Sequence, residues 1–420
     1  MQLRDYQREA VDMGYSTLMS RSIVYLALQT RTGKTIISLT IAKKIGLPVL
    51  FVTKKKAIGS IQRDHTASGY GLDLTVINYE MLKTIIHQKR LIVIDEAHGT
   101  GAYPKPSLRA KQLRQITRDC PVIMLSATPT PESHSQIYHQ LWCANARLSF
   151  IYQYDNFYKW AKRFVNIREK RIGTGQVVKD YSDAIEALIK PELNPIMITL
   201  TQEEAGFAQT SQDEVEICSP LPDKLKDIYR TIRKDGVAQI GLIKVIADTA
   251  ASKMSKLHQL CGGTVIDERG YGRIISPHKI PALLDIVKQH KKLAIYYKFE
   301  AERVMITNAI DSDLLCSDWQ EFEMRDTAVY LCQFQSGREG INLATASAIV
   351  FYNIDHAYLS YEQTRNRIMA MEKTDRGTLY FMLSEGGIEK EILEVVRKKK
   401  NFTTAYFERR ETKIIKGWTT

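Results

Sequence analysis

Residues 29–35 form a run, Gln-Thr-Arg-Thr-Gly-Lys-Thr, whose residue types and spacing suit a phosphate-binding loop. The run closes a strand-like segment at 22–28 and opens a helix-like segment at 36–45. Backbone N–H groups at the start of a helix can cradle the phosphates of a nucleotide, because the helix dipole is positive there. Lys34 would add a mobile cation and the Thr35 hydroxyl a ligand for Mg²⁺. The nucleotide-binding residues expected in this run are Thr30, Arg31, Thr32, Gly33, Lys34 and Thr35.

The loop is incomplete by the usual pattern. The spacing G-x-x-x-x-G-K-T would place another glycine at the position of Leu28. A short Gly-Lys-Thr also arises by chance, so the loop needs support from partners elsewhere in the chain.

A second motif supplies those partners. Asp95 and Glu96 follow an apolar, strand-like run at 91–94, and ligands of open α/β sheets bind at the carboxyl ends of the strands. Asp95 would hold Mg²⁺ through water and Glu96 would polarise the attacking water, which are two tasks of phosphate-anhydride hydrolysis. An acidic turn after a strand is common, but its place after a Gly-Lys-Thr in one alternating segment argues against coincidence.

Length and composition describe a basic globular protein. The 420 residues predict two or three domains, and 44% hydrophobic with 25% charged residues is ordinary for a soluble chain. A net charge of +12 and a pI of about 9.2 suit a polyanion such as nucleic acid, although a merely basic protein would look the same.

Cysteine usage and hydropathy indicate a compartment. The six cysteines are scattered without a close pair or a His-Cys cluster, which argues against disulfides and a zinc site. No apolar run approaches the roughly 20 residues that span a bilayer, and residues 1–11 are amphipathic rather than signal-like. We expect a soluble, cytoplasmic protein.

Hydrophobic patterning predicts an α/β fold with parallel sheets. Short β-branched runs at 22–28, 48–53, 74–78, 91–94 and 122–125 alternate with helix-period runs. In the second half we predict strands at 293–297, 328–333, 348–352 and 378–383, and a hairpin over 264–276 that turns near 268–270. The helices expected there are 222–234, 242–261, 280–289, 301–310, 341–346, 358–369 and 388–400.

The alternation stops at residues 147–200, where aromatic and basic residues are interleaved around a turn at 173–175. Such a segment could grip a nucleic-acid backbone, but a helical subdomain with aromatics inside and basic residues outside is favoured. We place an amino-terminal domain at 1–205, including this insertion, a linker at 206–215 and a carboxyl-terminal domain at 216–420.

Together these motifs resemble those of superfamily 2 helicases of the SNF2-like branch. Asp95-Glu96-Ala97-His98 and Ser126-Ala127-Thr128 are similar to motifs II and III, and the run at 3–7 is similar to the adenine-reading motif. The resemblance implies two tandem RecA-like P-loop domains, with the helical insertion and hairpin added. It also implies that Gln7 recognises adenine.

The remaining motifs of the resemblance imply DNA contacts and an arginine finger. Residues 50–56 and 76–80 resemble motifs Ia and Ib, although 54–56 could equally be a solvated turn. Residues 335–343 resemble motif V, which approaches both nucleotide and DNA, and 363–367 resemble the start of motif VI. Arg367 would reach the γ-phosphate from the opposite domain and Gly340 would approach the nucleotide. The implied DNA contacts are Thr53, Lys54, Lys55, Asn78, Thr128, Ser336 and Gly337.

Two residues depart from the family pattern. Arg31 stands where such loops usually carry another glycine, and Ala370 stands where motif VI repeats its arginine. Ala370 could be natural or engineered, and turnover should be impaired unless Arg365 or Arg338 substitutes. Compactness and this version of the loop look like bacteriophage SNF2-type helicases, including branch-migration enzymes, which would place the protein in a bacterial host cytoplasm.

The function expected from the resemblance is that of a DNA helicase or translocase. It would use ATP and Mg²⁺, with Lys34, Asp95, Glu96 and Arg367 as catalytic residues, and act as a monomer on duplex, forked or four-way DNA. An RNA helicase is an alternative that Asn366 fits poorly. An ATP-gated DNA clamp with impaired hydrolysis is another, and a P-loop kinase would leave the second domain unexplained.

Overall fold

The computed structural model describes residues 2–145, 148–172, 176–206, 213–316, 318–334, 343, 345–357, 360–361, 364 and 377–398. The chain forms two compact units, Met1–Ala208 and Gln209–Thr420. The linker at 206–215 remains a proposal of domain organisation. Within the described residues, no helix is both long and apolar enough to cross a membrane.

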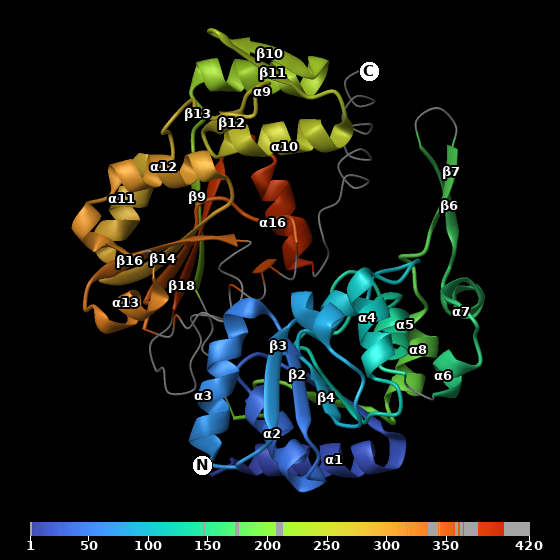
Figure 1. The fold of residues 1–420 in the computed structure, drawn as a ribbon. Coiled ribbons are helices and arrows are strands. Elements are labelled where there is room, and N and C mark those ends of the chain that lie inside the picture. The colour runs from blue at the N-terminus through green and yellow to red at the C-terminus, as the bar shows by residue number, and fades with distance from the viewer. Residues whose placement is uncertain are drawn as a thin grey trace. The chain divides into compact units, whose positions relative to one another are not determined.

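The first unit contains a six-stranded parallel sheet with the order β3-β2-β4-β5-β1-β8 (Figure 1). The strands predicted in this half are confirmed to within a residue, because each is a short apolar run. β8 was not predicted. The strands are β1 (Ile23–Leu28), β2 (Val49–Thr53), β3 (Leu74–Asn78), β4 (Leu91–Ile94), β5 (Val122–Leu125) and β8 (Met197–Leu200).

Alternate residues of these strands face two different hydrophobic clusters. In β1, for example, Tyr25 packs with one cluster while Val24 and Leu26 pack with the other. One face is covered by α1 (Asp5–Arg21), α2 (Lys34–Ile45) and α3 (Ile58–Ser68). The other is covered mainly by α4 (Leu108–Ile116), α5 (Gln136–Cys143), α7 (Phe157–Phe164) and α8 (Glu186–Leu193). Three short 3-10 turns join these elements: η1 (Lys55–Ala57), η2 (Tyr79–Thr84) and η3 (Ala97–Thr100).

The predicted helical insertion contains α6 (Ser149–Tyr152), α7, α8 and an unpredicted two-stranded ribbon of β6 (Arg168–Ile172) and β7 (Gln176–Asp180). Phe157, Trp160 and Phe164 of α7 are buried, whereas Lys162 and Arg163 are exposed. The expected arrangement of aromatics inside and basic residues outside is therefore found in this helix for all aromatic residues but Tyr158, which is exposed.

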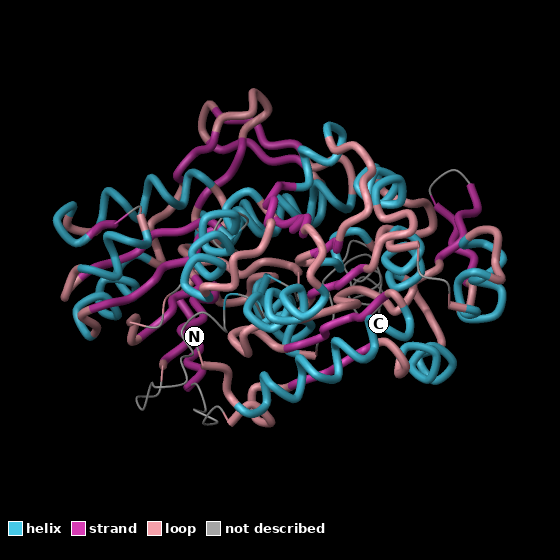
Figure 2. The backbone as a smooth tube through the Cα atoms, turned by 60° about the horizontal axis from the view of Figure 1, so that its bottom comes forward, coloured by secondary structure: helices cyan, strands magenta, loops and turns pink. Residues whose placement is uncertain are grey.

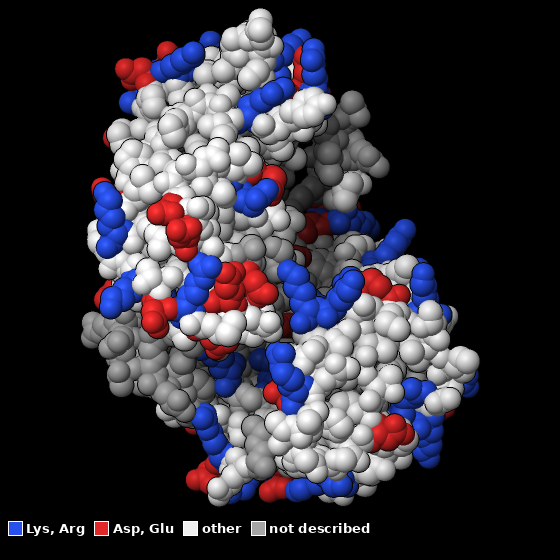
Figure 3. Space-filling model, turned by 60° about the vertical axis from the view of Figure 1, so that its left-hand side comes forward, with Lys and Arg blue, Asp and Glu red and all other residues white. Residues whose placement is uncertain are grey.

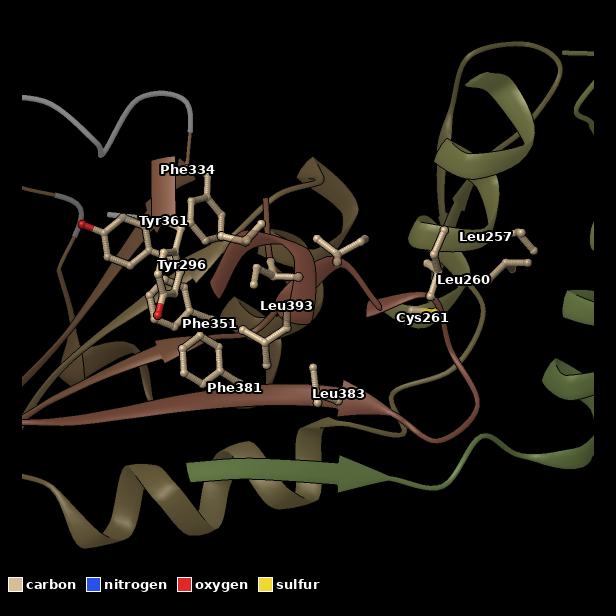
Figure 4. Packing of buried hydrophobic residues seen from close by; sticks show 14 of the residues in the cluster. Leu257, Leu260, Cys261, Tyr296, Phe334, Phe351, Tyr361, Phe381, Leu383 and Leu393 are labelled. Carbon is tan, nitrogen blue, oxygen red and sulfur yellow. The ribbon is translucent and has the colours of Figure 1, made fainter. Parts of the chain in front are cut away.

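The second unit also contains a six-stranded parallel sheet, in the order β15-β16-β14-β17-β18-β9. Strands are magenta and helices cyan in Figure 2. Together the two sheets confirm the predicted α/β class. Aromatic side chains of β14, β17 and β18, including Tyr296, Phe351 and Phe381, pack on one face (Figure 4). The strands are β9 (Asp213–Ser219), β14 (Lys292–Tyr297), β15 (Leu315–Cys316), β16 (Ala328–Gln333), β17 (Ala348–Phe351) and β18 (Thr378–Ser384).

Most predicted helices of this unit are present, and the predicted hairpin is confirmed as β12 (Thr264–Ile266) and β13 (Gly272–Ile274). The helices predicted at 341–346 and 358–369 fall mostly outside the described residues. The helices and short turn found are α9 (Asp223–Asp235), α10 (Ala250–Cys261), α11 (Ile280–Gln289), α12 (Glu300–Ala309), η4 (Ser312–Leu314), α13 (Trp319–Met324) and α16 (Glu389–Arg397).

One predicted helix is wrong in its first part. The helix expected over 242–261 begins only at Ala250, and a hairpin of β10 (Val237–Ile240) and β11 (Ile243–Ile246) precedes it. Ala238, Ile240 and Val245 are buried while their neighbours in the strands are more exposed, which is the period of a strand. Gly241 makes the turn with φ +61°.

Candidate nucleotide site

The phosphate-loop candidate connects β1 to α2 at the carboxyl edge of the first sheet. Gly33 precedes the helix with φ +88°, and Arg31 also has a positive φ, +66°. A Cβ atom on residue 33 would lie 2.3 Å from Nε2 of Gln7. Gly33 is therefore required both by the backbone conformation and by close packing.

Lys34 and Thr32 stabilise the loop from within. The Lys34 ammonium donates to the backbone oxygens of Leu28, at 3.0 Å, and Gln29, at 3.2 Å. The Thr32 hydroxyl donates to the same Gln29 oxygen at 2.8 Å. Phosphate oxygens would offer the ammonium charged acceptors, which form stronger hydrogen bonds than neutral carbonyls. The Lys34 ammonium can thus give up its hydrogen bonds to the loop carbonyls and bind the phosphates of a nucleotide instead.

Gln202, just after β8, also holds the loop and was missed by the sequence reasoning. Its backbone N–H donates to Oε1 of Gln29 at 2.8 Å, and its Nε2 donates to the backbone oxygen of Thr30 at 3.0 Å. The first pair is separated by 173 residues, so no local pattern could reveal it. Since β8 itself was not predicted, no expected strand end could have drawn attention to Gln202.

Gln7 ties α1 to the loop. Its Oε1 accepts from the backbone N–H of Arg4 at 3.0 Å, and its Nε2 donates to the backbone oxygen of Thr32 at 3.3 Å. The side chain is buried. Gln7 therefore lies beside the loop, and its adenine recognition remains a prediction.

The two acids lie where β4 ends. Oδ2 of Asp95 accepts from the Thr53 hydroxyl at 2.7 Å, and the Tyr79 hydroxyl donates to the Asp95 backbone oxygen. Burial, with a smaller contribution from the Glu96 charge, raises the pKa of Asp95 to about 6, while Thr53 and Lys34 oppose the rise. Lys34 is thus close enough to act on Asp95, which connects the loop and the acidic turn electrostatically.

Glu96 lies beside a hydrogen bond that joins the acidic turn to the third motif. It has φ +50°, an uncommon conformation for a side chain with a Cβ. Its Oε2 lies 3.4 Å from Nδ1 of His98, and that nitrogen lies 3.0 Å from the Ser126 hydroxyl. The Ser126 oxygen in turn accepts from the backbone N–H of Thr128 at 3.1 Å. The acidic turn and the turn after β5 therefore form one hydrogen-bonded unit.

These residues fit a magnesium ion carried by a nucleotide. Asp95 offers a carboxylate, and Thr35 lies in the first turn of α2, so the expected ligands are oxygens, which Mg²⁺ prefers. Within the described residues, no group of three or more His, Cys, Asp and Glu side chains could hold a metal alone. This suits Mg²⁺, which usually keeps waters and takes further ligands from phosphates.

The residues expected to bind DNA occupy different environments. Thr53 is buried and its hydroxyl is bonded to Asp95, so a DNA contact there would come from the backbone. Oδ1 of Asn78 accepts from the backbone N–H of Met81 at 3.0 Å and begins η2. Lys55 is exposed, while Lys54 and Thr128 are half-buried. Their DNA contacts stay predictions.

Net charge does not by itself mark a DNA-binding face. On the face shown in Figure 3, Lys and Arg side chains are interspersed with Asp and Glu side chains. The residues of the second unit that the sequence analysis singled out lie outside the described residues. They are the predicted site residues and the residues discussed beside them: Ser336, Gly337, Arg338, Gly340, Arg365, Asn366, Arg367 and Ala370.

Two parallel α/β sheets, the first with the candidate phosphate loop and the acidic turn at its carboxyl edge, are consistent with the expected tandem RecA-like domains. Over 158 residues, 37% of the chain, the protein is 25% identical to the chromatin-remodeling ATPase INO80 of Mycosarcoma maydis. Over 161 residues, 38% of the chain, it is 24% identical to INO80 of Eremothecium gossypii. The matched stretches cover 8% and 11% of these relatives, so the chain spans a small part of their length.

A solved structure, the Sulfolobus solfataricus SWI2/SNF2 ATPase core domain, is 16% identical and aligns over 95% of this chain and 89% of that chain with a TM-score of 0.41. No protein-family model matches the chain. The sequence similarity, at low identity, is to chromatin-remodeling ATPases. None of these named relatives is a bacteriophage protein, and the expected bacteriophage likeness rests on the sequence motifs alone.

Proposed function

We propose that the chain is a DNA-dependent ATPase that moves along duplex or branched DNA as a monomer. The observation that carries this proposal is that the loop with Lys34 and Thr35 follows β1 and the acidic turn with Asp95 and Glu96 follows β4, at the same carboxyl edge of one parallel sheet. The similarity to chromatin-remodeling ATPases supports the use of ATP, and the basic net charge of the chain supports DNA as the polyanion.

In the proposed reaction, the start of α2 and the Lys34 ammonium bind the β- and γ-phosphates. Thr35 and Asp95 would hold a magnesium ion, which would neutralise phosphate charge when bound. Glu96 accepts the proton of the water that attacks the γ-phosphorus, as the bond to the bridging oxygen breaks. His98 lies 3.4 Å from Oε2 of Glu96 and is itself bonded to Ser126, so it would limit the positions open to the Glu96 carboxylate.

In the proposed reaction, the Arg367 guanidinium stabilises the negative charge on the γ-phosphate. Binding and release of ATP would then change how the two units engage DNA, in the manner of hinged enzymes. We further propose that this ATP-driven movement unwinds branched DNA.

The test is steady-state ATP hydrolysis with linear duplex, forked DNA, four-way DNA and structured RNA. We expect DNA to stimulate hydrolysis more than RNA does, and Glu96→Gln to remove the stimulated rate. Strand separation on the forked substrate distinguishes a helicase from a translocase. Strongest stimulation by RNA would reassign the protein to RNA helicases.

An ATP-gated DNA clamp is the second candidate, favoured by Ala370 and by the positive φ of Arg31. A clamp would show nucleotide-dependent DNA affinity without phosphate release. Hydrolysis that is lost in Lys34→Ala and raised in Ala370→Arg would exclude the clamp and would assign position 370 to the arginine set.

A further inference from the structure

The ribbon of β6 and β7 stands apart from the cores of the first unit. Among the described residues, its strands pair only with each other, in the antiparallel register from Arg168↔Asp180 to Ile172↔Gln176. Figure 1 shows it projecting from α7. Val177 and Val178 are 49% and 41% exposed. A two-stranded ribbon is marginally stable alone in water, so this one depends on its root or on a partner.

The root of the ribbon is fixed to the body of the unit. The backbone N–H of Asn166 donates to the Asp183 oxygen at 2.8 Å, and Val165 forms an antiparallel bridge with Ala184. Tyr181 is buried, with its ring 5.4 Å from that of Phe157. The ribbon of β6 and β7 is thus fixed to the unit at its base, and we call it the arm.

The attachment points of the arm lie on the connection that follows β5. The Ser133 hydroxyl donates to the Ser182 oxygen at 2.7 Å, and the Ser135 hydroxyl donates to the Tyr181 oxygen at 2.6 Å. Both serines belong to the connection from β5 to α5, which begins with the turn containing Thr128. That connection leaves the carboxyl end of β5, so the arm is rooted on the same sheet edge as Asp95.

The arm is basic. Its ten strand residues include four Lys or Arg and two Asp or Glu. Lys179 is exposed, and the Arg168 side chain is 68% exposed although it pairs with Asp183. Lys162 and Arg163 at the end of α7 add exposed positive charge near the root. This charge suits a polyanion rather than an apolar protein surface.

We propose that the β6–β7 ribbon is a second DNA-binding element, which lies along a groove of duplex DNA and contacts its phosphates. The major groove admits a two-stranded ribbon, and phosphate contacts from Lys and Arg position a protein without reading sequence. The inference rests on the proposed function, since it assumes that DNA is the substrate of the proposed ATPase. The ribbon extends the DNA-binding surface beyond the sheet edge.

The first test measures duplex DNA affinity against salt for the full chain. The variant carries Arg168→Gln, Lys170→Gln, Arg171→Gln and Lys179→Gln. The slope of log K against log salt should fall by about 0.9 for each phosphate that the variant no longer neutralises. A matched control carries Arg21→Gln, Lys43→Gln, Lys89→Gln and Arg118→Gln, four exposed residues near the opposite, amino-terminal edge of the sheet. The control should change the slope less.

The second test places a photo-crosslinking side chain at Val178. We expect crosslinks to duplex DNA, and we expect DNA-independent ATP hydrolysis to stay at the wild-type rate in the ribbon variant. Equal slopes in ribbon and control variants, or no crosslink at Val178, would overturn the ribbon proposal while DNA-stimulated hydrolysis continued. Wild-type protein that neither binds DNA nor responds to it would overturn the proposed function as well.

Discussion

The carboxyl edges of the two sheets place charged residues in opposite situations. In the first unit, Asp95 and Glu96 are like charges side by side, half-buried, with Lys34 near enough to lower the pKa of Asp95. In the second unit, the buried Lys279 ammonium lies 2.5 Å from Glu389, and Lys298 lies 2.9 Å from Asp355. One edge concentrates negative charge, whereas the other pairs charges of opposite sign.

Glu302 of the second unit is a buried carboxylate whose surroundings differ from those of Asp95 and Glu96. It occupies the first turn of α12, fully buried, and burial raises its pKa to about 7. Its oxygens accept from the backbone N–H groups of Lys298, at 2.9 Å, and Phe299, at 3.0 Å, and from Asn353 Nδ2, at 2.5 Å. Glu302 therefore has a structural set of partners. Asp95 and Glu96 form a pair that a cation would stabilise, which is why we assign chemistry to the first edge.

The largest effect is expected for Lys34→Ala, which removes the cation of the first edge. Loss of one preorganised charge donor typically lowers turnover by about 100- to 1,000-fold. ATP hydrolysis at saturating ATP measures it, with Lys43→Ala at the far end of α2 as the control. Activity within about threefold of wild type in Lys34→Ala would contradict the assignment.

Lys279→Met should instead affect folding of the second unit. Removing one partner of a buried ion pair leaves Glu389 uncompensated and costs about 3 to 5 kcal/mol. Hydrogen exchange of peptides from β14, β17 and β18 reports this loss, with β1 and β4 as internal references. The double variant Lys279→Met/Glu389→Gln should recover part of the stability, because no buried charge remains. Equal losses in single and double variants would show that the pairing is not the cause.

Asp95→Asn should stabilise the first unit while abolishing hydrolysis. A folded-state pKa of about 6, above the ordinary 3.8, means that the ionised carboxylate is disfavoured on folding. Its cost is absent below about pH 4, grows as pH rises and reaches at most about 3 kcal/mol above pH 6. Hydrogen exchange of β4 at pH 8 and pH 4, without magnesium, should show the gain only at pH 8. A gain of the same size at both pH values would refute the burial argument.

The smallest effect is expected for Gln202→Ala. The substitution removes the hydrogen bond to the Thr30 oxygen, which contributes about 1 kcal/mol, so ATP affinity should fall about fivefold. Titration with a fluorescent ATP analogue measures this change, and the exposed neighbour Glu203 provides the control Glu203→Ala. Unchanged affinity in Gln202→Ala would mean that the loop does not depend on this hydrogen bond.

Sequence patterns predicted β4 and β5 because both are short apolar runs bounded by polar residues, buried on both faces. They did not predict β8 or β9 at the sheet edges, nor the hairpin before α10, where alternation was mistaken for a helix. The sequence could not predict which side chains hydrogen-bond to one another. The motif at Thr53 indicated DNA, whereas the structure uses its hydroxyl for Asp95, because only the folded sheet brings the ends of β2 and β4 together.

The central claim is that Asp95 and Glu96 at the first sheet edge perform chemistry, whereas the buried Glu302 of the second unit is structural. DNA-stimulated ATP hydrolysis by Glu96→Gln and Glu302→Gln, two Glu-to-Gln changes in the corresponding regions of the two units, tests it most directly. We predict that Glu96→Gln loses at least about 100-fold of the turnover, whereas Glu302→Gln, confirmed as folded by hydrogen exchange, retains it. Full activity in Glu96→Gln, or an equal loss in folded Glu302→Gln, would contradict the account.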